Sequence, residues 1–231
     1  MYDNIIVIPF RDRETQLQYF IKHSVPVIQK HLPNSMIVVV EQDDKKPFNR
    51  GALLNVAFAE YSLDTDNFIT HDVDINPRKD IMKYYRNPVK TDCVRAILSP
   101  ELCLGAIVKI QSNTICKVNG FPNHHWGWGA EDKALQNRCE FYGVNRESIL
   151  THHDKTRDDQ YFKCFDEHER IKHDFNCKYW YNFHVWNQMT DVMKKEDIDA
   201  EGINTLEYDI TEKIFIHPLV ELIKVKIKIS P

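Results

Sequence analysis

The chain has 231 residues, a length that suits one domain with a sizeable hydrophobic core. Its composition is that of an ordinary globular protein, with 42% hydrophobic residues, 28% charged residues and a net charge of −4. The chain has no excess of basic residues that would indicate a nucleic-acid partner, and no apolar run approaches the roughly 18 residues of a membrane span. Six scattered cysteines without paired-motif spacing favour free thiols in a reducing compartment.

The first part of the chain alternates strand-like and helix-like segments. Residues 4–9 and 37–40 are apolar and rich in β-branched residues, as buried strands of parallel sheets are, and residues 67–70 follow as a third strand. Apolar residues at helical spacing predict helices over 13–24 and 49–61. This alternation is typical of a Rossmann-like, doubly wound α/β sheet, whose ligands gather at the carboxyl ends of the strands.

Fewer elements are predicted further along the chain. Ser112 is expected to cap a short helix that ends at Val118, and another helix is expected to begin at Glu131. Residues 155–196 are predicted to be irregular, while strict alternation over 224–229 predicts a half-exposed terminal strand.

An acidic triplet, Asp72-Val73-Asp74, follows directly after the third predicted strand. Alternate residues of an extended segment point to the same side, so the two carboxylates are expected to project together where the strand ends. Paired hard oxygen ligands suit Mg²⁺ or Mn²⁺ that bridges phosphates. The structural alternative is that Asp72 and Asp74 only cap the turn that leads to Pro77.

The segment from Gly120 to Asp132 is the most informative part of the chain. Its glycines permit backbone angles that other residues avoid, which indicates a loop shaped around a ligand. An indole can stack on the apolar face of a sugar ring while a carboxylate meets its hydroxyls. The structural alternative is a tryptophan-bearing core turn. The chemistry-bearing residues here are Trp126, Gly127, Trp128, Gly129, Glu131 and Asp132.

With these segments the chain resembles the β-1,4-galactosyltransferases, a family of metal-dependent inverting enzymes with a GT-A fold. The matching motifs occur in the family's order and run from near the first residues to near the last. They are Ile8 to Arg13, Phe48 to Asn55, Asp72 to Asp74, Val118 to Asn123, Trp126 to Asp132 and Gly202 to Leu206. The resemblance implies one glycosyltransferase domain over 1–231, with the nucleotide bound by residues 1–80 and the donor and acceptor sugars by residues 81–231.

The resemblance also implies a nucleotide site and a catalytic base. An aromatic ring stacks on a base and arginine pairs with phosphate oxygens, so the physical chemistry agrees. The base matches Asp132 in the family's acidic pair, with Glu131 beside it, and the segment Trp126 to Gly129 surrounds the sugars. The nucleotide-binding residues carried over are Pro9, Phe10, Arg11, Arg13, Phe48, Arg50, Asp72, Val73 and Asp74.

For the metal, Asp74 matches the family's carboxylate ligand, and Mn²⁺ is the expected cofactor. Relatives take further ligands from a downstream stretch that ends in a histidine, preceded either by a methionine three residues earlier or by a second histidine two residues earlier. Here Ile149 or Thr151 stands at that earlier position, so His152 and His153 are both candidate ligands. Carboxylate plus imidazole suits Mn²⁺ better than Mg²⁺ and does not exclude Zn²⁺ or Co²⁺.

The expected reaction is transfer of galactose from UDP-galactose to a sugar hydroxyl of a glycan or glycoconjugate, with a β-linkage formed. Cys103 stands where the family has an aromatic residue that blocks an N-acetyl group, so UDP-GalNAc is the alternative donor. A non-catalytic sugar-binding protein on the same scaffold is the alternative from another class. Lys133 replaces a second Asp that helps hold the acceptor in animal enzymes, so the resemblance does not extend to GlcNAc as acceptor. Ala130 replaces a glycine of the hinge-like segment.

Animal members of the family are anchored in the Golgi membrane. This sequence shows neither anchor nor stem, so the expectation is a soluble, cytoplasmic enzyme of bacterial or viral type. A Golgi-lumen enzyme is expected only if the chain is a trimmed form of a longer protein.

Overall fold

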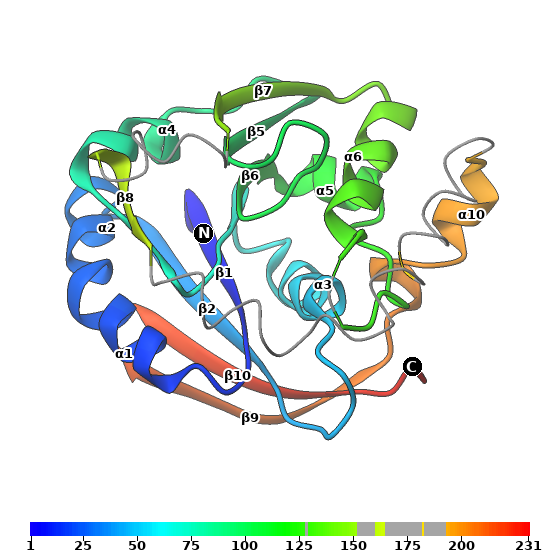
Figure 1. Ribbon diagram of the computed structural model, residues 1–231, viewed down its shortest axis with the longest axis horizontal. Coiled ribbons are helices and arrows are strands. Elements are labelled where there is room, and N and C mark those ends of the chain that lie inside the picture. The colour runs from blue at the N-terminus through cyan, green and yellow to red at the C-terminus, as the bar shows by residue number, and fades with distance from the viewer. Residues whose placement is uncertain (128, 152–159, 165–181, 183–192) are drawn as a thin grey trace.

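A computed structural model describes residues 1–127, 129–151, 160–164, 182 and 193–231 (Figure 1). Its centre is an eight-stranded mixed sheet with the order β7-β5-β6-β3-β1-β2-β10-β9. The strands of this sheet are β1 (Asn4–Phe10), β2 (Ser35–Gln42), β3 (Asn67–Thr70), β5 (Cys93–Leu98), β6 (Ile107–Gln111), β7 (Asn145–Leu150), β9 (Tyr208–His217) and β10 (Val220–Ile227). A separate two-stranded sheet consists of β4 (Ile75–Pro77) and β8 (Phe162–Cys164).

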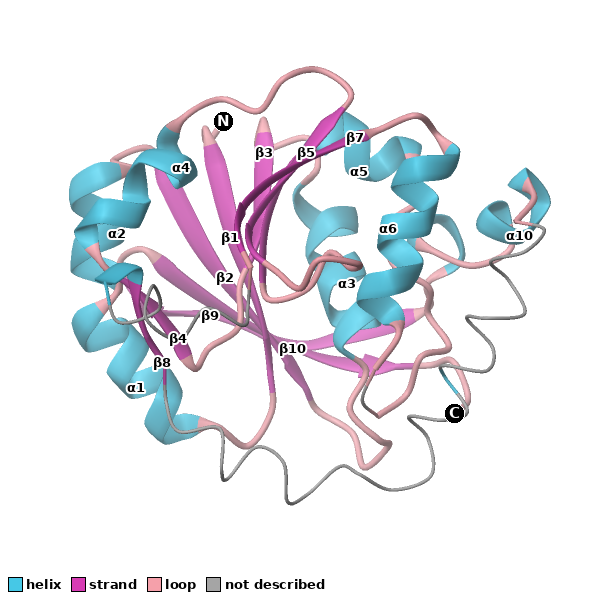
Figure 2. Cartoon of the chain, turned by 45° about the horizontal axis from the view of Figure 1, so that its top comes forward, coloured by secondary structure: helices cyan, strands magenta, loops and turns pink. Residues whose placement is uncertain are grey.

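Helices flank the large sheet on both faces (Figure 2). The α-helices are α1 (Glu14–His23), α2 (Val25–His31), α3 (Arg50–Tyr61), α4 (Met82–Arg86), α5 (Ser112–Lys117), α6 (Glu131–Phe141) and α10 (Lys195–Asp199), and the 3-10 helices are η1 (Lys79–Ile81) and η2 (Ile203–Thr205). Helices α1, α2 and α4 cover one face, whereas α3, α5 and α6 cover the other. Within the described residues, no helix combines the length and hydropathy that crossing a bilayer requires.

Strand β1 lies in the middle of the sheet and is buried on both faces. Ile5 and Val7 belong to the core beneath α3, whereas Ile6 and Ile8 belong to the core beneath α1 and α2. The strand pairs in parallel with both β2 and β3. Burial on both sides explains why this segment reads as a continuous apolar run rather than an alternating one. The first three predicted strands and the helices after them are therefore confirmed.

One prediction about a single element is wrong, and another is confirmed with different bounds. The N-cap position of α5 is Gln111, whose side chain makes no capping hydrogen bond, and the Ser112 hydroxyl donates to the carbonyl of Thr65 at 2.6 Å. The predicted terminal strand over 224–229 is part of β10, which begins four residues earlier at Val220 and lies inside the sheet between β2 and β9. The predicted alternation is confirmed, because Val225 and Ile227 are buried and Lys226 is exposed.

One edge of the sheet collects the loops that carry the predicted motifs. The parallel strands β1, β2 and β3 all end there, and β5 and β7 end at the same edge because β6 runs antiparallel to both β3 and β5. Residues 11–13, 43–49 and 71–74 follow the first three strands, and residues 99–106 connect β5 to β6. Polar side chains far apart in sequence therefore meet at this edge.

Candidate active site

Arg50, at the first residue of α3, links two acidic segments. Its guanidinium donates to Asp72 Oδ1 through Nε at 3.2 Å and through a terminal nitrogen at 3.0 Å. The other terminal nitrogen lies 3.7 Å from Glu131 Oε1 and donates no hydrogen bond to any of the described residues. Burial alone would lower the pKa of Arg50, but the nearby carboxylates, Asp72 first, outweigh burial and hold that pKa above its usual value. Arg50 is therefore a fixed, half-enclosed cation with donor capacity left over.

The other predicted nucleotide-binding residues lie beside Arg50. Arg11 donates to the carbonyl of Lys46 at 2.6 Å, and its guanidinium carbon lies 5.3 Å from the centre of the Phe48 ring. Phe48 is half-buried, whereas Phe10 is fully enclosed in the core beneath α1. Phe48 is thus the ring that a planar base can reach, and Pro9, like Phe10, lies in buried β1.

The acidic triplet forms a turn rather than an extension of β3. The amide of Ile75 donates to the carbonyl of Asp72 at 3.3 Å, which closes the turn. The alternation argument therefore does not apply, and the two carboxylates meet different arginines: Asp72 meets Arg50, and Asp74 Oδ2 lies 3.9 Å from Arg13. Val73 between them is buried. Both carboxylates still lie at the loop edge of the sheet.

His71 stabilises this turn through both of its ring nitrogens. One ring nitrogen lies 2.9 Å from the carbonyl oxygen of Asp72, and the other lies 2.9 Å from the hydroxyl of Tyr85. Burial lowers the pKa of His71 to about 4, so the ring is neutral at ordinary pH. A neutral, doubly bonded imidazole fixes the backbone that carries Asp72 without adding charge.

Glu131 and Asp132 occupy the first turn of α6, where the helix dipole favours carboxylates. The backbone carbonyl of Asp132 accepts from the amide of Leu104 at 3.0 Å, so the 99–106 loop and α6 are joined. Burial, as the larger cause, and the charge of Asp132 raise the pKa of Glu131 to about 7, although Arg50 opposes the shift. The pair therefore places one carboxyl group that titrates near neutrality next to a second one.

Of the two tryptophans of the predicted sugar site, the structure describes Trp126. Trp126 has only 2% of its surface exposed and packs in the core beneath α3, so the core interpretation describes it. Gly127 donates to the carbonyl of Phe48 at 2.7 Å and has a φ of 79°, which glycine adopts without strain. Trp128 lies outside the described residues. Gly129, with a φ of 105°, continues the turn into α6.

The described residues supply part of a metal donor set. Asp74 offers carboxylate oxygens, which suit Mn²⁺, at the loop edge of the sheet. His152 and His153 lie outside the described residues, two and three positions after β7 ends at Leu150. Within the described part of the chain, no group of three histidines, cysteines or acidic residues can hold a metal.

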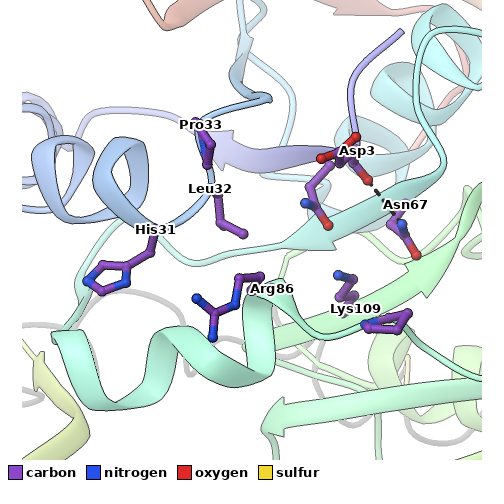
Figure 3. Close-up of a pocket in the computed structure, with 9 residues that line it drawn as sticks. Asp3, His31, Leu32, Pro33, Asn67, Arg86 and Lys109 are labelled. Atoms are coloured by element: carbon purple, nitrogen blue, oxygen red, sulfur yellow. Dashed lines mark hydrogen bonds between the residues drawn. The ribbon is translucent and has the colours of Figure 1, made fainter.

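A cavity of about 300 Å³ lies at the opposite edge of the sheet, near the start of β1 (Figure 3). Asp3, His31, Arg86 and Lys109 are among the residues that line it. The ammonium group of Lys109 donates to the carbonyls of Tyr85 and Asn87, at 2.6 and 3.2 Å. These contacts give Lys109 a structural role, and none of the predicted site residues borders this cavity.

Two family models match the chain in succession. The model described as the N-terminal region of glycosyl transferase group 7 matches residues 1–87, and that described as the N-terminal domain of galactosyltransferase matches residues 92–163. Bovine (Bos taurus) β-1,4-galactosyltransferase 1 is 31% identical over 217 residues, which cover 90% of this chain and 50% of that protein. The chain belongs to the β-1,4-galactosyltransferase family. Human (Homo sapiens) β-1,4-galactosyltransferase 6 is 38% identical over 149 residues, 61% of this chain and 39% of that protein.

The chain thus spans half or less of the length of these curated relatives. Among solved structures, the catalytic domain of Drosophila β-1,4-galactosyltransferase 7 in complex with xylobiose matches all of this chain and 96% of that chain, with a TM-score of 0.79 and 21% identity. A variant of the same Drosophila enzyme, in complex with manganese, UDP-Gal and xylobiose, gives a TM-score of 0.78. The expected GT-A fold is therefore confirmed.

Sequence reasoning missed the asparagines that hold the galactosyltransferase motifs together. The Asn55 side chain donates to the carbonyl of Phe121 and to the Asn123 side chain, at 2.7 and 2.9 Å. Asn49 caps α3 and also donates to the carbonyl of Asn123 at 2.6 Å. Asn123 donates in turn to the carbonyl of Gly202 at 2.8 Å. Asn49, Asn55 and Asn123 each lie within one of the family motifs. The motif alone does not show whether such an amide supports neighbouring backbone or contacts the substrate.

The departures of this chain from the family pattern have visible consequences. Ala130 has a φ of 71°, a left-handed conformation that disfavours alanine and suits the glycine of the family pattern. The amide of Lys133 donates to Asp132 Oδ1 at 2.8 Å. Cys103 is buried, with 4% of its surface exposed, and burial, together with the charge of Asp132, raises the pKa of its thiol.

Proposed function

We propose that this chain is an inverting, UDP-sugar-dependent hexosyltransferase that moves galactose from UDP-galactose to a sugar hydroxyl. The observation that carries the proposal is the meeting of Arg50, Asp72 and Glu131 at the loop edge of the sheet, with Asp132 next in the chain. This reaction requires three kinds of group: cations that bind the diphosphate, carboxylates that bind a metal, and a base that accepts the proton of the hydroxyl. Membership of the galactosyltransferase family supports the same reaction.

On this proposal, the nucleotide lies against the loops that follow β1 and β2. The uracil stacks on Phe48, which is half-buried and already packs against Arg11. Arg11, Arg13 and Arg50 face the diphosphate, and the terminal nitrogen of Arg50 that has no hydrogen-bond partner among the described residues donates to a phosphate oxygen. A guanidinium already fixed by Asp72 needs little reordering to bind, which favours tight binding.

Asp74 would hold a divalent metal, Mn²⁺ by preference, together with His152 or His153. When bound, the metal neutralises charge on the departing diphosphate. The Drosophila relative in complex with manganese and UDP-Gal supports this assignment. If only one histidine is a ligand, its replacement by alanine should raise the metal requirement about tenfold or more, while replacement of the other should not.

Asp132 is the general base of the proposed reaction. Its carboxylate accepts the proton of the acceptor hydroxyl as the hydroxyl oxygen bonds to the anomeric carbon. The bond from that carbon to the diphosphate oxygen breaks, and UDP leaves with the electron pair. A single displacement converts an α-linked donor to a β-linked product. Glu131, fixed by Arg50, orients the start of α6.

UDP-GalNAc transfer is the alternative function. Cys103 supports it, because a thiol occupies far less space than the aromatic ring expected there and leaves room for an acetamide group. A non-catalytic sugar-binding protein is less well supported, because a lectin does not need the arginines and carboxylates of a diphosphate site. The acceptor is a carbohydrate; the Drosophila relative was solved with xylobiose.

The test is a transfer screen with UDP-galactose, UDP-GalNAc and UDP-glucose against a panel of xylosides, glucosides and N-acetylhexosaminides, each with Mn²⁺ and with EDTA. The product's anomeric configuration is read from the proton NMR coupling constant. The proposal expects metal-dependent transfer with a β-linkage from UDP-galactose. An α-linked product, or UDP binding without transfer to any acceptor, would contradict it.

A further inference from the structure

Gln42, the last residue of β2, holds the loop that follows it. Residues 43–49 have no regular secondary structure, so the conformation of this loop depends on other contacts. The Gln42 side chain is buried, and its amide nitrogen donates to Asp44 Oδ1 at 2.8 Å and to the carbonyl of Pro47 at 3.0 Å. Its amide oxygen accepts from the backbone amide of Asn49 at 2.8 Å. One buried side chain therefore binds the loop near both of its ends.

The partners of Gln42 fix the direction in which its amide points. The carbonyl of Pro47 can only accept a hydrogen bond, and the backbone amide of Asn49 can only donate one. If the amide were turned over, it would face both groups with the wrong atom and leave them unpaired in a buried site, which is unfavourable. The side chain therefore has one arrangement that satisfies the loop.

The Phe48 ring depends on this arrangement. Phe48 lies between the two backbone groups that Gln42 binds, and its own carbonyl accepts from the amide of Gly127 at 2.7 Å. Arg11, whose guanidinium carbon lies 5.3 Å from the centre of the Phe48 ring, donates to the carbonyl of Lys46 in the same loop at 2.6 Å. The conformation that Gln42 holds thus determines where the Phe48 ring and the Arg11 guanidinium lie.

We propose that Gln42 is a positioning residue for nucleotide binding. It holds the 43–49 loop so that the Phe48 ring is in place to stack on the uracil before the UDP-sugar binds. The inference rests on the proposed function, which assigns Phe48 to the nucleotide. Gln42 is buried and its hydrogen-bonding groups are used within the loop, so it acts through Phe48 and not by contact with the nucleotide. A loop ordered in advance lowers the entropic cost of binding.

The first test is Gln42→Met, which keeps the length of the side chain and removes its hydrogen bonds. Calorimetry with UDP and Mn²⁺ should show an affinity about tenfold lower, because the loop must then be ordered on binding. The KM for UDP-galactose should rise by a similar factor, whereas kcat should stay within about twofold, because the lost interaction serves donor binding and Asp132 lies outside this loop.

Gln111→Met is the matched control. Gln111 is also the last residue of a strand, β6, and its side chain donates to the carbonyl of Val89 at 3.0 Å. It pairs with Asn67 at the start of β3, and therefore lies at the opposite edge of the sheet from the candidate site. Equal losses of UDP affinity in Gln42→Met and Gln111→Met, or unchanged affinity in Gln42→Met, would overturn the proposal.

A double-mutant cycle tests whether Gln42 acts through Phe48. Phe48→Ala removes the ring that the loop presents. Gln42→Met should therefore lower UDP affinity about tenfold in the wild-type background but less than about threefold when Phe48→Ala is also present. Additive losses would show that Gln42 does not act through the Phe48 ring, and would overturn the proposal.

Gln42→Glu provides a readout that the shape of the side chain does not affect. The introduced carboxylate can still accept from the Asn49 amide, but it cannot donate to the carbonyl of Pro47 and it repels Asp44. Protonation restores a donor, so UDP affinity relative to the wild type should be low at pH 8 and should recover at pH 5.5. A ratio that does not change with pH would contradict the proposal, and this variant provides the test if Gln42→Met does not fold.

These experiments separate the positioning role from the proposed function. If Gln42→Met weakens UDP binding but the wild type transfers no sugar, then the transferase proposal fails and the positioning role stands. If the wild type transfers galactose and Gln42→Met keeps wild-type UDP affinity and KM, then the function stands and the positioning role is overturned. If the wild type does not bind UDP, both fail. The thermal unfolding of each variant confirms that the fold is intact.

Discussion

Because the pKa of Glu131 is raised, the contribution of this residue to the free energy of unfolding should fall as the pH rises. This side chain is only 12% exposed, and its charge is opposed by burial and by Asp132. Its pKa rises to about 7 in the folded state, so the folded protein holds a proton that the unfolded chain releases at lower pH. Glu131 therefore contributes stability that is fully present below about pH 4.5 and is lost as the pH rises through about 7.

A pKa difference of this size corresponds to about 3 kcal/mol of unfolding free energy between pH 4.5 and pH 8. Arg50 is already included in that figure, because its attraction at 3.7 Å lowers the pKa of Glu131 against the larger effect of burial. Glu131→Gln removes the titrating group and retains the shape. Relative to the wild type, the variant should therefore gain up to about 3 kcal/mol of stability as the pH rises over this range.

Urea unfolding, followed by tryptophan fluorescence in metal-free buffer, measures the free energy of unfolding at several pH values from 4.5 to 8.5. Glu14→Gln is the matched control, because Glu14 is also the first residue of a helix, α1, but is exposed to solvent. It reports the effect of neutralising a carboxylate at a helix start. A Glu131→Gln difference that does not change with pH, or one that changes in the opposite direction, would refute the reasoning.

Three further predictions follow from the geometry of the site. Ala130→Gly should raise the free energy of unfolding by about 1 kcal/mol, because alanine at a φ of 71° is strained, and a thermal melt showing a lower Tm would contradict this. Asp74→Ala should reduce Mn²⁺-dependent UDP binding about tenfold or more in calorimetry, and unchanged affinity would remove Asp74 from the metal site. Cys103→Tyr should lower the ratio of UDP-GalNAc use to UDP-galactose use in a competition assay, and strict galactose selectivity in the wild type, unchanged by the substitution, would refute the size argument.

The parallel half of the fold was predictable because its strands are buried on both faces. Residues 4–9 and 37–40 are continuously apolar, so the only structure they predict is a strand buried on both faces. The spacing of apolar residues predicted the helices that follow these strands. The strands β5, β6 and β7 were not predicted, because β5 and β6 carry charged residues inside the sheet and β7 is a polar edge strand in which only Leu150 is buried. Arg95 and Lys109 are buried on β5 and β6, where both donate to carbonyls of the segment around Asn87 and Arg95 also pairs with Glu147 at 2.8 Å. Only the tertiary structure shows that such strands can be buried.

The candidate site was predictable in its residue types and not in its contacts. The rule that ligands gather at the carboxyl ends of strands placed Arg11, Arg13 and Asp74 correctly at one edge of the sheet. The alternation argument for the acidic triplet failed because the segment is a turn, closed by its own backbone. The proximity of Arg50 to Glu131 depends on how α3 packs beside α6, which no local pattern encodes.

The most direct test of the account is the transfer rate of Asp132→Asn. Asparagine keeps the shape of the side chain but cannot accept the proton of the acceptor hydroxyl. Loss of a general base typically lowers kcat about 10²–10⁴-fold, and UDP affinity should stay unchanged because Asp132 does not bind the nucleotide. A variant that keeps more than about a tenth of wild-type kcat would contradict the assignment of Asp132 as the base.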